Sequence, residues 1–125
     1  MFESMKHAAK LASLMKDLPR IKSRMEQVRE EMALRTVRGT SGGGAVNATV
    51  NGKLKVVSIE LSPALVAGLD SKDSVSRAYA EALVAEAVNS ALEQAHRMVG
   101  EALTQAAREL DVPLPEGMLG ELLGQ

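Results

Sequence analysis

The sequence contains no cysteine and no tryptophan, and it has only one phenylalanine and one tyrosine among 125 residues. The absence of cysteine excludes disulfides, thiolate metal sites and thiol nucleophiles. The shortage of aromatic residues means that the core must be built from Ala, Val, Leu and Met. These side chains bury less area each than aromatic ones. We therefore expect the chain to gain stability by associating with a second copy of itself.

Long apolar stretches are also missing. No segment approaches the roughly 20 consecutive apolar residues of a membrane-spanning helix. The first residues of the chain are interrupted by Lys6, Lys10 and Lys16, which does not fit the apolar stretch of a signal peptide. We therefore expect a soluble, cytoplasmic protein.

Residues that often carry out chemistry are few and scattered. His7 and His96 fall in different predicted helices, and neither has another histidine three or four residues away. The sequence shows no pairing of a nucleophile with a base and no carboxylate–histidine cluster. The glycine run at 39–44 lacks the Gly-Lys-Ser/Thr ending of a nucleotide-binding loop and precedes a strand instead of a helix. We predict no enzyme activity, no metal site and no cofactor, and we interpret the glycine run as a flexible connector.

The net charge of −1 conceals an asymmetry along the chain. Residues 1–38 contain nine basic and five acidic residues, a net charge of +4, whereas residues 39–125 have a net charge of −5. A basic first third on an acidic body indicates either a surface that attracts phosphate or an ordinary solvated helix face.

A β-hairpin is predicted at the centre of the chain. Apolar and polar residues alternate over 46–51, Asn51-Gly52 supplies a type I′ turn, and a β-branched run follows up to Leu61. The apolar phase changes within the second strand, which requires a bulge near Val56-Val57 or burial of both faces. A short first strand at 34–38 is a further expectation.

Two long helices flank this sheet in the prediction. The first spans about residues 2–34, because apolar residues recur from Leu11 to Met32 at alternating intervals of three and four, as in a heptad seam. Pro19 lies inside it and predicts a kink or a break. We expect part of the seam to pack on the sheet and part on a partner helix. The second helix spans about residues 72–110, with Asp70, Ser71 and Asp73 as candidate N-caps. Together these elements make one domain over residues 1–112, followed by a flexible tail at 113–125.

Several short motifs resemble the YbaB/EbfC family of small bacterial nucleoid-associated proteins. They cover most of the chain in the family's order. The matching segments are Gly39, Ser41–Gly44, Val46, Val50–Gly52, Val57, Ile59, Ser62-Pro63, Leu83-Val84, Ala87–Ala91 and Leu114–Met118. The resemblance implies an α+β fold with α-β-β-β-α order, a small antiparallel sheet between two long helices, and a tweezer-like homodimer. It also implies a protein of the nucleoid that binds double-stranded DNA, affects nucleoid organisation and gene expression, and has no enzymatic activity and no cofactor.

The contacts to DNA are predicted from the basic residues of the first helix and of the hairpin. Backbone contacts of this kind give strong salt dependence and little sequence dependence. The candidate DNA-binding residues are Lys16, Arg20, Lys22, Arg24, Arg29, Lys53 and Lys55. The candidate dimer-interface residues are Val56, Val57, Ile59, Val84, Val88, Ala91 and Ala95.

A second hypothesis is a dimeric accessory module. It would dock on replication or DNA-repair proteins through the tail or the acidic faces, with weak or no direct DNA binding.

Overall fold

The computed structural model describes residues 2–110, so the predicted tail at 113–125 lies outside the described range. The elements follow in the order α1 (Phe2–Ala33), β1 (Thr36–Ser41), the 3-10 turn η1 (Gly42–Gly44), β2 (Val46–Asn51), β3 (Val56–Leu61), α2 (Pro63–Leu69) and α3 (Ser74–Glu109). The strands form one antiparallel sheet in the order β1-β2-β3. The predicted α+β class is confirmed, and the short helix α2 lies between β3 and α3.

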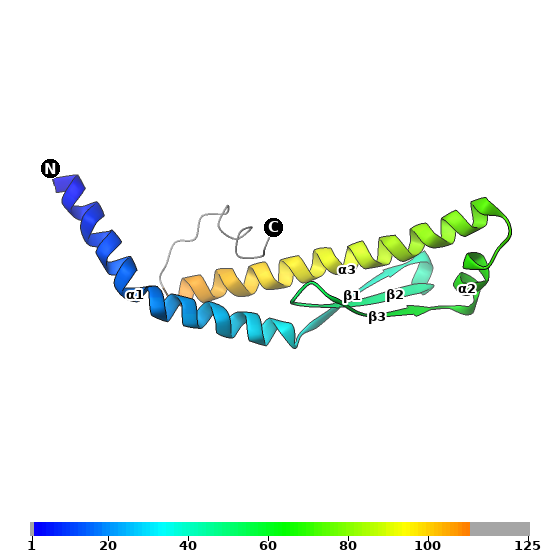
Figure 1. Cartoon of the computed structure of the whole chain (residues 1–125), viewed down its shortest axis with the longest axis horizontal. Coiled ribbons are helices and arrows are strands. Elements are labelled where there is room, and N and C mark those ends of the chain that lie inside the picture. Colours follow the sequence, from blue (N-terminus) through cyan, green and yellow to red (C-terminus); the bar gives the residue numbers. More distant parts are fainter. Residues whose placement is uncertain (1, 111–125) are drawn as a thin grey trace.

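The described chain is elongated, with α3 running along most of its length (Figure 1). The sheet and α2 lie along the N-terminal half of α3. The second half of α1 lies antiparallel to the C-terminal half of α3, and the first half of α1 projects beyond the end of that helix (Figure 1). The molecule therefore has two cores, one on each half of α3.

The first core is the contact between the sheet and α3. Val46, Ala48 and Val50 of β2 are fully buried and alternate with half-buried polar residues. They pack with small residues of α3 such as Ala87 and Ala91. Small side chains let the backbones approach closely: a Cβ added at Gly39 of β1 would lie 2.3 Å from the Ala87 carbonyl oxygen.

β3 belongs to the sheet but is not covered by α3. Leu61 pairs with Val46, and Ile59 pairs with Ala48, so these side chains lie on the α3 side of the sheet because opposed residues share a face. They are nevertheless 38% and 43% exposed. Val50 pairs with Val56, and the register shift at this point confirms the predicted bulge.

The second core is formed by α1 and α3, and it corrects the predicted role of the heptad seam. Met25, Val28 and Met32 are buried against residues of α3 that include Val99 and Leu103. The second half of the seam therefore packs on a helix of the same chain, and the predicted contact with the sheet was wrong. α1 continues through Pro19, and Figure 1 shows the helix changing direction part-way along its length.

Two predicted connections also differ from those in the structure. The glycine run is not a flexible connector, because Gly39 lies within β1 and the remaining glycines form the η1 turn, where all have positive φ. The predicted type I′ turn at Asn51-Gly52 was wrong. The loop is longer: Asn51 Oδ1 accepts hydrogen bonds from the Lys53 and Lys55 N–H groups at 2.9 and 3.3 Å, and positive φ falls on Leu54.

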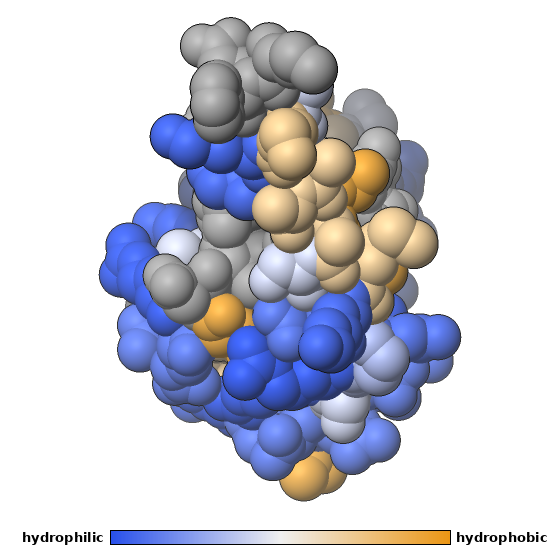
Figure 2. All heavy atoms as spheres, turned by 90° about the vertical axis from the view of Figure 1, so that its left-hand side faces the viewer, coloured by the Kyte–Doolittle hydropathy of each residue, from blue (hydrophilic) through white to orange (hydrophobic). Residues whose placement is uncertain are grey.

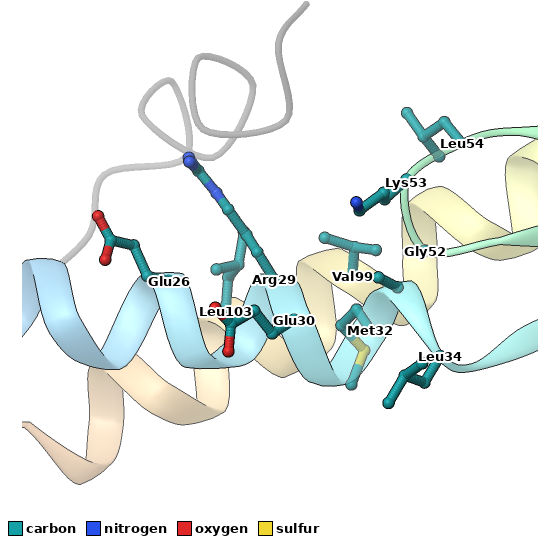
Figure 3. Close-up of a pocket in the computed structure, with 11 residues that line it drawn as sticks. Glu26, Arg29, Glu30, Met32, Leu34, Gly52, Lys53, Leu54, Val99 and Leu103 are labelled. Atoms are coloured by element: carbon teal, nitrogen blue, oxygen red, sulfur yellow. The ribbon is translucent and has the colours of Figure 1, made fainter.

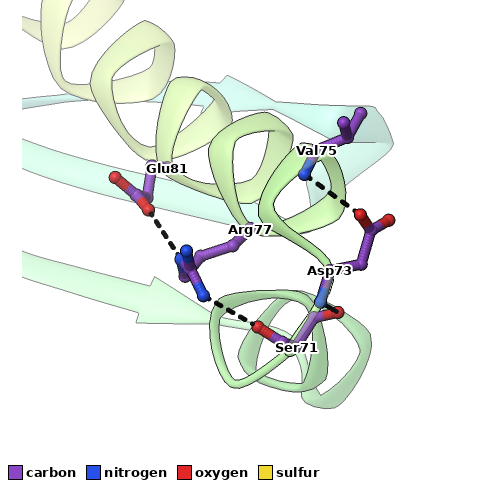
Figure 4. A network of polar contacts seen from close by, with 5 residues as sticks. All are labelled: Ser71, Asp73, Val75, Arg77 and Glu81. Atoms are coloured by element: carbon purple, nitrogen blue, oxygen red, sulfur yellow. Dashed lines mark hydrogen bonds and ion pairs between the residues drawn. The ribbon is translucent and has the colours of Figure 1, made fainter.

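The start of α3 is fixed by a polar network (Figure 4). Asp73 is the N-cap, as predicted among three candidates, and its carboxylate accepts a hydrogen bond from the Val75 N–H at 3.3 Å. Arg77 donates to the Ser71 carbonyl and pairs with Glu81 at 3.8 Å. Orphan N–H groups at a helix start need such partners, so this network sets where α3 begins.

Candidate functional site

The hairpin loop lies against the C-terminal end of α1. The Gly52 N–H donates to the carbonyl oxygens of Met32 and Arg35 at 3.1 and 3.2 Å. A Cβ at position 52 would lie 2.3 Å from the Met32 carbonyl oxygen, so glycine permits this close approach. Residues of the loop are thereby placed beside α1, although they lie about twenty positions further along the chain.

The loop, α1 and α3 together enclose a groove of about 700 Å³, here called the hairpin groove. Its apolar lining includes Met32, Val99 and Leu103. Four charged residues also line it, and they are Glu26, Arg29, Glu30 and Lys53. Figure 3 shows Lys53 on the loop side and Arg29 on the α1 side of the groove. The structure thus brings two of the predicted DNA-binding residues, 29 and 53, to one site from separate elements.

The predicted cations of α1 fall on two different sides of the helix. Lys22 and Arg29 are seven residues apart and share one side, which is the side of the hairpin groove. Lys16, Arg20 and Arg24 are spaced by four residues and follow another side. A single flat DNA-binding surface made of all five is therefore not formed by α1 alone.

Arg24 has a structural role. Its guanidinium pairs with Glu31 at 3.8 Å and with Glu109, the last residue of α3, at 3.3 Å. Its side chain is 28% exposed. The contact joins α1 to the end of α3, and both carboxylates offset the positive charge of Arg24. Arg20 lies near Asp17 at 4.0 Å, with both side chains largely exposed, an arrangement that contributes little to stability.

Two basic residues that were not predicted line a second hollow on α3. Arg35 and Arg97 lie there with Gln94 and Glu101. No local pattern could have shown that α1 ends beside the middle of α3.

The candidate interface residues divide into exposed and buried groups. Val56, Val57 and Ile59 are 45%, 57% and 43% exposed on β3. Val84 and Val88 are partly buried at the edge of the sheet core. Ala91 and Ala95 are fully buried beneath the sheet of the same chain, so they support this surface from inside and do not lie on it. Leu61 of β3, which is 38% exposed, was missed by the prediction.

The first half of α1, residues 2–20, is here called the arm. Leu11 is 61%, Met15 63% and Leu18 53% exposed, so the first half of the heptad seam has no partner among the described residues. Figure 2 views the molecule from the end where the arm projects, and apolar side chains gather on one side of it. Basic residues on the arm are Lys6, Lys10, Lys16 and Arg20. The arm is amphipathic and cationic.

Residues 2–110 include no helix with the length and apolarity needed to cross a bilayer. Within the same range, no three His, Asp or Glu side chains are grouped closely enough to hold a metal ion.

Comparison with known proteins shows which family and which relatives this chain resembles. The family model of the YbaB/EbfC DNA-binding family matches residues 5–110. The chain is 35% identical over 101 residues to a nucleoid-associated protein of Thermoanaerobacter sp. strain X514, covering 81% of this chain and 86% of that protein. It is 39% identical over 94 residues to a nucleoid-associated protein of Chlorobium phaeobacteroides strain BS1, covering 75% and 78%.

Proposed function

The chain belongs to the YbaB/EbfC DNA-binding family, and from this premise we propose that it is a nucleoid-associated protein that binds duplex DNA in bacteria. The protein acts as a homodimer, contacts DNA mainly through the phosphate backbone, and affects nucleoid organisation and gene expression. It carries out no catalysis and needs no cofactor.

The observation that supports phosphate contacts is that Arg29 and Lys53 both line the hairpin groove. The two cations come from elements whose backbones are joined by the hydrogen bonds of Gly52, so the fold brings both residues to the same groove. Glu26 and Glu30 on the same helix limit the local excess of positive charge. This arrangement favours moderate, salt-sensitive binding. Lys22 and Lys55 extend the positive surface outward from this point, whereas Lys16 and Arg20 of the arm add positive charge on another side of α1.

Sequence-independent binding is the expected mode. Phosphate contacts position a protein on DNA, whereas base contacts specify sequence. The described residues include one aromatic side chain with a defined environment, Tyr79, which lies near the start of α3. This position is at the opposite end of the helix from the hairpin groove, so stacking on bases contributes nothing at this site.

The supporting observation for the homodimer is the uncovered strand β3. Three of its residues, Val56, Val57 and Ile59, are large, apolar and exposed. Exposed apolar edge strands promote pairing with other chains unless they are covered. In the proposed dimer the β3 strands and the adjacent flank of α3, at Val84 and Val88, meet their symmetry mates in an isologous interface.

A salt titration of duplex binding by the purified protein tests the function. We expect log Kobs to fall linearly with the logarithm of salt concentration. Lys53→Gln should weaken binding uniformly across unrelated sequences, whereas Lys72→Gln should have little effect. Lys72 is the matched control because it is exposed near the start of α3, far from the groove.

Two results would contradict the proposal. Equal effects of the two substitutions would move the DNA contact away from the hairpin groove. Absence of duplex binding at low salt would instead favour the alternative of an accessory module for replication or repair proteins.

A further inference from the structure

The hairpin groove keeps apolar surface open at its edge. Leu34 lines the groove and is 87% exposed. Ala33 and Leu54 also line it and are only half-buried. Exposed apolar surface next to an open groove is typical of a surface that another segment covers. The next question is which segment lies within reach.

The described chain ends close to the groove. The ion pair between Arg24 and Glu109, at 3.3 Å, places the last residue of α3 beside position 24 of α1. On this side, the lining of the groove runs from Glu26 of α1 to Leu34, the residue after the end of α1. At 1.5 Å per residue, this stretch begins about 3 Å and ends about 15 Å further along the helix. A segment that continues from Leu110 therefore starts next to the groove.

Residues 111–125 are such a segment, and their composition suits the groove. Fifteen residues span up to about 50 Å when extended, which exceeds the distance required. The prolines at 113 and 115 disfavour a continuation of α3. The apolar residues of the segment are Val112, Leu114, Met118, Leu119, Leu122 and Leu123, and its charged residues are all acidic, Asp111, Glu116 and Glu121.

We propose that residues 111–125 dock in the hairpin groove of their own chain and oppose DNA binding there. Apolar side chains of the segment cover Leu34 and Leu54. Acidic side chains lie near Arg29 and Lys53, away from Glu26 and Glu30, and compete with DNA phosphates for the two cations. Docking within one chain is favoured because a covalently attached segment has a high effective concentration. The regulatory part of this inference rests on the proposed function, whereas the docking part does not.

Cross-linking tests the docking without DNA. The chain has no native cysteine, so Ala33→Cys combined with Leu119→Cys introduces the only two thiols. The full-length double variant is treated with a short bismaleimide, and the linked peptides are identified by mass spectrometry. The matched control combines Thr40→Cys with Leu119→Cys, because Thr40 is exposed on β1. We expect the groove pair to link several times more efficiently than the control pair.

An equal mixture of 15N-labelled and unlabelled protein distinguishes the source of the segment. Links within one isotopic species support docking in the same chain. Mixed-isotope links at the statistical frequency would show that the segment comes from a second copy, and would overturn the proposal. Equal yields for the groove and control pairs would also overturn it, because the segment would then have no preferred site.

The effect on DNA is measured with charge-neutral substitutions. Glu116→Gln combined with Glu121→Gln should tighten duplex binding several-fold at low salt, and the gain should disappear when Lys53→Gln is added. Glu86→Gln combined with Glu93→Gln removes the same charge from an exposed face of α3 and should have a smaller effect. Equal gains would show general electrostatics and contradict masking of the groove. If the protein binds no DNA at all, the proposed function fails, while the cross-linking result still decides the docking.

Discussion

Glycine has opposite roles at two positions of this chain. At Gly39 an added Cβ would lie 2.3 Å from the Ala87 carbonyl oxygen and 2.4 Å from the Ala91 nitrogen, both backbone atoms of α3. At Gly100, within α3, an added Cβ would meet no atom within 4 Å. The first glycine allows β1 to approach α3, and the second only lowers helix propensity.

These positions give a matched pair of substitutions. Gly39→Ala should lower the free energy of unfolding by about 2 kcal/mol or more, because backbone atoms cannot yield as a flexible side chain can. Gly100→Ala should raise it by about 0.5–1 kcal/mol. Urea denaturation at fixed protein concentration measures both. A loss at Gly100 or no change at Gly39 would contradict the assigned contacts.

The hydrogen bonds at the start of α3 change the pKa of Asp73. The hydrogen bond from the Ser76 hydroxyl, at 2.8 Å, and then the bond from the Val75 N–H lower the pKa of Asp73 below its ordinary value. A group with a lowered folded-state pKa stabilises the fold above its unfolded pKa, and this stabilisation is lost as pH falls through the folded value.

The expected result is a pH-dependent effect of Asp73→Ala. At pH 7 the substitution should lower Tm by a few degrees, because it removes the N-cap of α3. The difference from the unaltered protein should shrink as pH falls below about 3.9, the ordinary aspartate pKa. Thermal melts followed by circular dichroism check this, with Asp70→Ala as a control that removes the same charge just before α3. A difference that stays constant down to pH 2 would contradict the role of the carboxylate.

The candidate site shows which residue properties are readable from sequence. The basic character of α1 and of the hairpin is a local property, so the candidate cations were identifiable. The partners of Arg24 were not, because Glu109 lies 85 positions away. An experiment that reversed the charges of both Lys22 and Arg24 could therefore not separate loss of DNA contacts from loss of the ion pair between α1 and α3.

At the scale of elements, the apolar periodicity of the sequence predicted which helices and strands form. It was less informative about which elements they contact. The intervals of three and four along α1 and the alternation in β2 predicted a helix and a strand that are both observed. Apolar periodicity says which face is buried but not against what, so the partner of the seam was misassigned. The predicted type I′ turn was wrong for a related reason. Gly52 contacts the end of α1, and local turn rules do not include such a contact.

The two halves of α1 should therefore respond differently to truncation of seam residues. Val28 is 2% exposed in the contact with α3, whereas Leu18 is 53% exposed on the arm. Val28→Ala should lower the free energy of unfolding by about 2 kcal/mol. Leu18→Ala should change it by less than about 0.5 kcal/mol. Urea denaturation at low protein concentration measures both, and equal losses would show that the arm is packed within the single chain.

At the scale of the whole molecule, the central feature is that one helix, α3, packs against a three-stranded sheet. α3 contacts β1 and β2 and leaves β3 uncovered. Within residues 2–110, the large apolar side chains of β3 are left exposed. The shape of the molecule therefore favours completion by a second copy, which the composition had already suggested.

Substitutions on β3 test the two faces of the strand separately. Ile59 lies on the α3 side of the sheet, and Ser58, which pairs with Thr49, lies on the opposite face. Ile59→Asn should shift the protein toward the monomer in sedimentation velocity experiments at micromolar concentration. Ser58→Asn, which leaves the apolar surface intact, should not. An unchanged dimer with Ile59→Asn would place the interface elsewhere.

The same variant connects assembly to DNA binding without altering charge. An isologous dimer presents two copies of Lys53 and Arg29, and the slope of log Kobs against log salt is about −0.9 for each phosphate neutralised. Ile59→Asn should thus roughly halve the slope, because a monomer presents one set of contacts. Lys53→Gln in the intact dimer should reduce its magnitude by about 1.8, since two lysines are lost. A monomeric variant that keeps the full slope would show that each chain binds DNA independently, and that the dimer serves another purpose than joining two phosphate-binding sites.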